Sequence, residues 1–117
     1  MEDSKDLMLS EVMERLDGDK EFLLELATEF LASFEASWER LRGAVQHGEY
    51  GEVDFQAHTL KSALGNLGAV GAAEICGELE RIGRFKGDLE LGGRLVEELR
   101  EGVDRFGVRI RLLGGGE

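Results

Sequence analysis

The chain has 117 residues, enough for one domain around one hydrophobic core, and 42% of them are hydrophobic, as in a folded domain rather than a disordered one. The net charge of −11 disfavours nucleic acid and anionic lipid as partners, because their phosphates would be repelled. The chain has no apolar run long enough to span a membrane, and its polar N-terminus is unlike a signal peptide. It has a single cysteine, Cys76, which disfavours a disulfide framework. These features predict a cytoplasmic location.

Helical periodicity and glycine-marked turns predict five helices and no strand. Asp19 and Asp88 are suitable N-caps for the second and fifth helices, because their side chains can accept hydrogen bonds from the first backbone N–H groups. Leu26 and Leu91 are among the apolar residues expected to face the core. The predicted helices, in chain order, are residues 7–16, 20–47, 52–67, 72–85 and 89–113.

Four of these helices are long and amphipathic, and short turns connect them. This pattern predicts an all-α fold: an antiparallel up-down four-helix bundle with an additional short N-terminal helix. The bundle is expected to occupy residues 1–113. The remaining residues, 114–117, are Gly-Gly-Gly-Glu and predict a flexible tail.

His58 is the most informative residue of the third predicted helix. The apolar positions of that helix step by four, three, four and three residues, so they share one face, and His58 lies roughly 140° from the centre of that face. We therefore expect an exposed imidazole. Lys61 follows at i+3, where its ammonium can reach a phosphoryl group carried by the ring. The apolar positions are Val53, Ala57, Leu60, Leu64 and Leu67.

Small residues accompany the histidine on its face. Gly65, at i+7, costs helix stability of about 1 kcal/mol relative to alanine, and it lies roughly 120° from the core stripe, so it predicts a bare patch that a partner can approach. Ser62, at i+4, leaves the ring uncrowded. Phe55, at i−3, either belongs to an apolar docking patch or packs under a neighbouring helix. Asp54, at i−4, is a further candidate for partner contact.

The segments Ala57-His58-Thr59-Leu60-Lys61 and Gly65-Asn66-Leu67-Gly68-Ala69 resemble the signature of the histidine phosphotransfer (HPt) domain of multistep phosphorelays. Ser62 is the one departure, since that family usually has glycine directly after the lysine. The resemblance implies that His58 carries a phosphoryl group between aspartates of response-regulator receiver domains, with Lys61 steadying the charge. It implies receiver partners from a hybrid sensor kinase, a downstream regulator or both, a monomer, no cofactor, and Mg²⁺ bound by the receiver rather than by this chain.

Two other classes of function are an enzyme and a non-catalytic binding module. No glycine-rich nucleotide loop is present, so the sequence predicts no ATP-dependent kinase activity. Asp54 and His58, at i and i+4, can face one metal ion, but no third ligand is evident. The remaining alternative is an acidic helical adaptor that docks a signalling partner without phosphotransfer. Lys61, Ser62 and Gly65 on the His58 face argue against it, since a simple adaptor has no need of a bare patch beside an imidazole.

Overall fold

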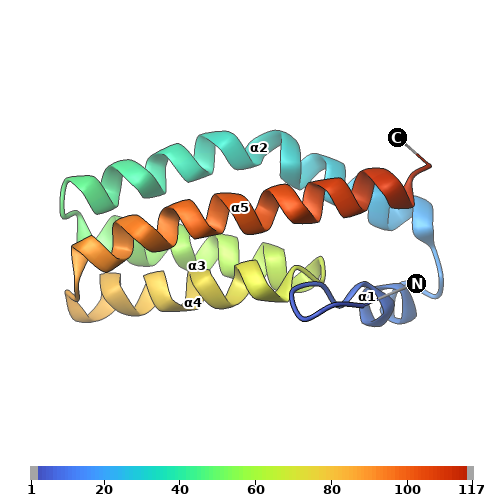
Figure 1. Cartoon of the computed structure of the whole chain (residues 1–117), viewed down its shortest axis with the longest axis horizontal. Coiled ribbons are helices and arrows are strands. Elements are labelled where there is room, and N and C mark those ends of the chain that lie inside the picture. The colour runs from blue at the N-terminus through green and yellow to red at the C-terminus, as the bar shows by residue number, and fades with distance from the viewer. Residues whose placement is uncertain (1–2, 116–117) are drawn as a thin grey trace.

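The structure is a computed structural model and describes residues 3–115. Within them the chain forms helices and no strand, which confirms the predicted all-α class. The helices are α1 (Leu9–Arg15), α2 (Lys20–Gln46), α3 (Tyr50–Asn66), α4 (Val70–Phe85) and α5 (Leu89–Leu113) (Figure 1).

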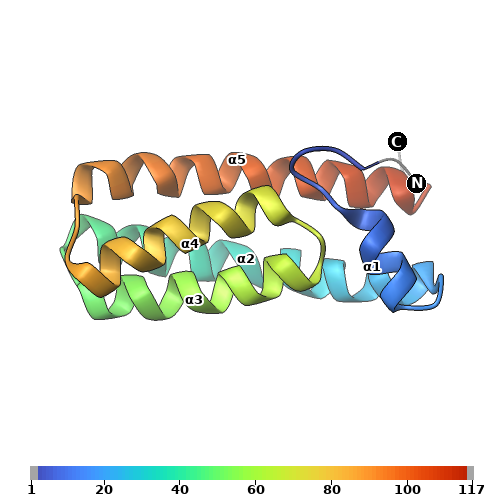
Figure 2. The same cartoon turned by 90° about the horizontal axis from the view of Figure 1, so that it is seen from below.

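The four long helices lie lengthwise beside one another, and α1 lies at the end of the molecule where α2 begins (Figures 1 and 2). Helix α3 packs against α2 and α4, and α5 also packs against α2 and α4. The contact between α3 and α4 is the most extensive, and the molecule is elongated, measuring 41 × 22 × 19 Å. No helix in residues 3–115 combines the length and hydropathy needed to cross a bilayer.

The predicted helix boundaries hold best where a side chain caps the helix. Asp19 accepts a hydrogen bond from the backbone of Phe22, and Asp88 accepts hydrogen bonds from Glu90 and Leu91, so both predicted N-caps are confirmed. Helix α5 has the predicted bounds, and α2 ends one residue before the predicted end.

Helices α3 and α4 each begin two residues earlier than predicted. Gly48 and Gly68 adopt positive φ angles of 67° and 82°, a conformation that side-chain-bearing residues rarely adopt. The turn before α3 is therefore made at Gly48 and the turn before α4 at Gly68. The next glycine in each case, Gly51 or Gly71, already lies in the helix. Helix α1 is also shorter than residues 7–16, because it begins at Leu9 and ends at Arg15.

The core is built from the apolar stripes of all five helices. Its largest fully buried side chains are Phe106, Leu9, Leu23, Leu41, Leu64, Leu79 and Leu99. The expectation for Leu26 and Leu91 was wrong, because they lie at the edges of their stripes and remain 36% and 37% exposed. The start of the predicted tail, at Gly114, follows the end of α5, while residues 116–117 lie outside the described part of the chain, so a flexible tail stays a prediction.

Gly83 is the residue that lets α4 approach α3. A Cβ atom at this position would lie 2.4 Å from the backbone nitrogen of Asp54 and 2.7 Å from the carbonyl oxygen of Tyr50. Backbone atoms cannot move aside as the end of a flexible side chain can. Only glycine therefore fits without displacing one helix from the other.

We expect Gly83→Ala to lower the free energy of unfolding by about 1–3 kcal/mol, the cost of overpacking a tight contact. Gly93→Ala is the matched control, because Gly93 is helical and a Cβ there meets no atom within 4 Å. The control should raise stability by up to about 1 kcal/mol, since alanine is the better helix former. Urea denaturation of both variants measures the difference, and equal effects would contradict the close contact at Gly83.

Candidate functional site

His58 projects from α3 with 60% of its side chain exposed. Its Nδ1 atom lies 2.6 Å from Oε2 of Glu80, a residue of α4. Because a carboxylate oxygen can only accept, Nδ1 carries the proton of the neutral ring, and the lone pair is on Nε2. No hydrogen bond to Nε2 is found among the described residues. The ring is therefore held at one nitrogen and open to a reaction partner at the other.

Glu80 is the centre of a cluster of charged side chains. It is 5% exposed, and its Oε1 accepts a hydrogen bond from Nζ of Lys61 at 2.6 Å. Nη2 of Arg84 lies 3.2 Å from Oε2. The hydrogen bond from Lys61 lowers the pKa of the Glu80 carboxyl below its usual value, burial opposes this shift, and the hydrogen bond from His58 adds to it. Glu80 is therefore an ionised, buried carboxylate.

The position of Glu80 follows from the pattern of α4. It stands four residues after the buried Cys76 and three before the buried Gly83, so it lies within the apolar stripe of the helix. The close approach at Gly83 brings this stripe against α3, next to His58 and Lys61. Glu80 thus reaches both residues although they are 22 and 19 positions away in sequence.

Lys61 lies at the site as predicted, but its ammonium is paired with Glu80 rather than free in solvent. The Lys61 side chain is 40% exposed. Ser62 and Gly65 are exposed on the same helix, and a Cβ at Gly65 would meet no atom within 4 Å. Gly65 therefore faces open space and is not a helix-packing glycine.

The two remaining predicted residues precede His58 on α3. Phe55 is 64% exposed, which decides between its two readings in favour of a solvent-facing aromatic side chain. Asp54 Oδ1 lies 3.4 Å from Nη2 of Arg84, so Asp54 pairs with a cation. Among residues 3–115, no group of three or more His, Cys, Asp or Glu side chains is placed to hold a metal ion.

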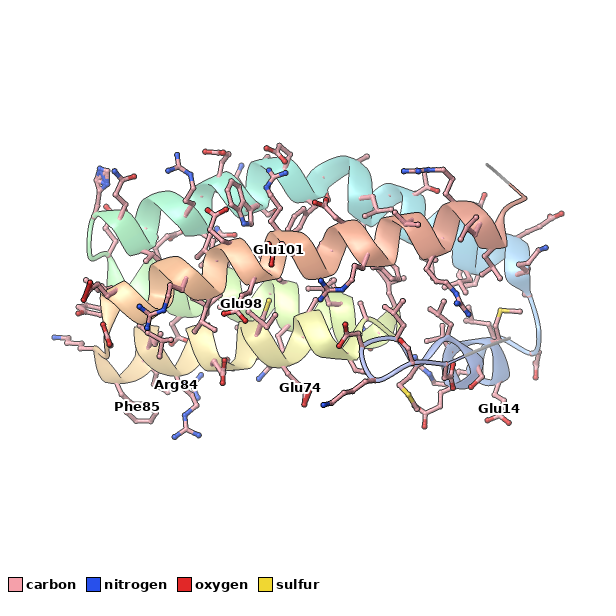
Figure 3. All side chains as sticks on the ribbon, viewed as in Figure 1. Glu14, Glu74, Arg84, Phe85, Glu98 and Glu101 are labelled. Atoms are coloured by element: carbon pink, nitrogen blue, oxygen red, sulfur yellow. The ribbon has the colours of Figure 1, made fainter. Side chains whose placement is uncertain are left out.

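Two residues of this cluster, Glu80 and Arg84, were not predicted as site residues from the sequence, and neither was the exposed Phe85 that ends α4. Glu80 had a usable signal, since an acidic residue within an apolar stripe implies a partner on the facing helix. Arg84 and Phe85 carried none, because exposed residues near a helix C-terminus are common. Figure 3 shows both projecting from the outer side of α4, and Phe85 is 71% exposed.

Cys76 and His47 also carry potentially reactive side chains, and each has a structural explanation in its own helix. Cys76 is fully buried, and burial raises the pKa of its thiol to about 12, so it is an inert core residue. His47 ends α2, where its Nδ1 lies 3.2 Å from the carbonyl oxygen of Gly43. Among residues 3–115 neither side chain is hydrogen-bonded to the cluster around Glu80, although the buried thiol lies close enough to Lys61 and Glu80 for their charges to act on its pKa.

A family model described as the Hpt domain matches residues 25–107, which include every residue of this cluster. The chain belongs to the Hpt domain family. The crystal structure of histidine-containing phosphotransfer protein B (HptB) from Pseudomonas aeruginosa PAO1 has the same fold, with a TM-score of 0.83 over 93% of this chain and 94% of that one at 23% sequence identity. Comparison with curated protein sequences found no match.

Membership in the Hpt family confirms the resemblance drawn from the sequence. The chain is a histidine phosphotransfer protein of two-component phosphorelays, and proteins of this family interact with response-regulator receiver domains. The adaptor alternative is not favoured.

The pairing of Glu80 predicts how the stability of this Hpt domain depends on pH. A carboxyl whose pKa is lowered by folding contributes stability above its unfolded pKa, about 4.3, and loses it as the pH falls through the folded value. Glu80→Gln should therefore lower the melting temperature at pH 7, and the difference from the parent should shrink as the pH falls below about 4. Thermal unfolding from pH 7 to pH 3 measures this. Glu78→Gln, at an exposed position of α4, is the control; if it matched Glu80→Gln, Glu80 would have no special pairing.

Proposed function

We propose that His58 is the phosphorylated residue, and that its Nε2 atom accepts the phosphoryl group from an aspartate of one receiver domain and delivers it to an aspartate of another. The observation that carries this proposal is the hydrogen bond between His58 Nδ1 and buried Glu80, on a ring that is 60% exposed. A nucleophile must present a lone pair to its partner, and this contact leaves the lone pair on Nε2.

The proposed transfer needs no additional proton. The Nε2 lone pair attacks phosphorus, the N–P bond forms, and the bond from phosphorus to the aspartyl oxygen breaks, returning that aspartate as a carboxylate. The proton on Nδ1 stays in place, so the phosphorylated ring is cationic, and the Glu80 carboxylate stabilises it. In the second transfer the new aspartate attacks phosphorus, the N–P bond breaks, and the neutral ring is restored.

Lys61 supplies positive charge beside the transferred group, as in other phosphoryl transfers, where catalysis is mainly positioning and charge stabilisation. Phe55, Ser62, Gly65 and Asp54 form the proposed contact surface for the receiver. Two of them support this directly: Phe55 is an exposed aromatic side chain, and Gly65 leaves the α3 backbone accessible. The chain itself needs no cofactor in this scheme, and Mg²⁺ belongs to the receiver.

We also propose the architecture of the bundle around the site, the oligomeric state and the cellular location. It places His58 on an antiparallel up-down four-helix bundle formed by α2 to α5, with α1 as the additional short helix; the packing of each long helix on two others supports this. A cytoplasmic monomer then meets one receiver at a time, from a hybrid sensor kinase, a downstream regulator or both. Because both receivers must reach the same atom, Nε2 of His58, they bind in sequence rather than simultaneously.

The experiment that tests the assignment is phosphotransfer from a ³²P-labelled receiver domain. The parent should acquire an acid-labile, base-stable phosphate, and His58→Gln should acquire none, because Gln has no nucleophilic ring nitrogen. His47→Gln is the matched control, since His47 is the other histidine and is also exposed; it should be labelled like the parent. Labelling of His58→Gln at the parental level would refute the assignment.

Gly65→Leu tests whether the receiver approaches α3 at this point. The leucine should block docking and reduce transfer at least about tenfold, while the protein stays folded, since the position is open and leucine is a better helix former than glycine. Gly93→Leu, at an equally open position of α5, should leave transfer unchanged. Melting temperature, receiver affinity and transfer rate should be measured for both. Normal transfer by Gly65→Leu would remove Gly65 from the contact surface.

A further inference from the structure

Lys61 has a partner before any phosphoryl group arrives. Its ammonium lies 2.6 Å from Oε1 of Glu80, while His58 Nδ1 lies 2.6 Å from Oε2 of the same carboxylate. The Lys61 ammonium and the His58 ring therefore contact the two oxygens of one carboxylate, which keeps the ammonium near the ring. If Lys61 is to pair fully with a phosphoryl group on Nε2, its ammonium must leave Glu80.

If the Lys61 ammonium left, the buried Glu80 carboxylate would lose one of its charged partners. The side chain of Glu80 is 7% exposed, and removing one partner from a buried ion pair leaves an uncompensated charge that is strongly unfavourable. His58 occupies only Oε2, so Oε1 would have no donor. A second cation that can take the place of Lys61 would remove most of this cost.

Arg84 is such a cation. Its Nη2 already lies 3.2 Å from Oε2 of Glu80, one helical turn away on α4, and its side chain is 55% exposed and so has room to move. A guanidinium presents several N–H groups in a planar fork that matches both oxygens of a carboxylate. Its other contact, to Asp54 Oδ1, is long at 3.4 Å, and a long contact at the surface is lost at little cost.

We propose that Lys61 exchanges partners during the phosphorylation cycle, from Glu80 in the free protein to the phosphoryl group in the phosphoprotein, and that Arg84 closes onto Glu80 to make the exchange favourable. Arg84 is thus a positioning residue that acts through Glu80 and Lys61. This inference rests on His58 being the phosphorylated residue.

The first test is the half-life of the phosphoprotein. Without Arg84, Glu80 competes more strongly for Lys61, so Arg84→Ala should shorten the phosphohistidine half-life about two- to fivefold, the factor associated with a partly exposed ion pair. Lys61→Ala should shorten it at least as much, and Arg84→Lys should restore part of it, because lysine keeps the charge without the fork. Arg81→Ala is the matched control: Arg81 is an exposed arginine of α4 for which no ion pair is found within the described residues, and it should behave as the parent does.

The second test follows the Lys61 ammonium directly, by ¹H–¹⁵N NMR of the lysine side chains. In the parent, the Lys61 Nζ resonance should shift on phosphorylation, and Glu80→Gln should shift it in the free protein. In phosphorylated Arg84→Ala the resonance should stay closer to its position in the free protein. A merely structural role for Arg84 would not produce this pattern, because it would not make the Lys61 signal depend on the phosphorylation state.

Two results would overturn the inference: a Lys61 resonance that does not respond to phosphorylation of the parent, or a half-life in Arg84→Ala equal to that of Arg81→Ala. Both measurements require label at His58, so they are separate from the assignment of the phosphorylated residue. Label on His58 with an unchanged half-life in Arg84→Ala refutes only the exchange. Parental labelling of His58→Gln refutes the proposed function itself.

Discussion

The buried carboxylate of Glu80 is the interaction on which the geometry of the site depends. One oxygen fixes the proton of His58 on Nδ1, and the other holds the ammonium of Lys61 beside the ring. A carboxylate this deeply buried is stable only with several donors, and it has three, two from α3 and one from α4. The same contacts that make its burial tolerable therefore orient the imidazole ring of His58.

Glu80 can act in this way because α4 lies against the backbone of α3. The contact at Gly83 brings the two helices together one turn from Glu80, so a short side chain spans the gap to both His58 and Lys61. A larger residue at Gly83 would widen that gap. The fold and the chemistry of the site are thus linked through one glycine, and a variant there would affect both stability and ring orientation.

The sequence predicted which residues of α3 face solvent, but it did not predict which residues of α4 join them at the site. Periodicity alone placed His58 outward and left Gly65 in open space, because both depend only on position within one helix. The apolar stripe of α4 indicates that Glu80 has a partner on another helix, but which residues Glu80 and Arg84 contact depends on which helices pack together, and no single-helix pattern contains that information. The starts of α3 and α4 were missed for a related reason: which of two nearby glycines takes a positive φ depends on how the turn packs. At Gly68, for example, a Cβ would clash with Val12 of α1 and with Met8, the residue before α1.

The charge balance of the cluster suits a protein that must release its phosphoryl group. Beside the ring of His58, the cluster contains two cations, Lys61 and Arg84, and two carboxylates, Glu80 and Asp54, and the charges of these four side chains balance. An unopposed pair of cations would hold a phosphoryl group tightly and resist its transfer onward. If His58 carries the phosphoryl group, as proposed, Glu80 competes with that group for both cations, and the group is stabilised only in part. A relay intermediate requires this compromise, since each transfer must be followed by another.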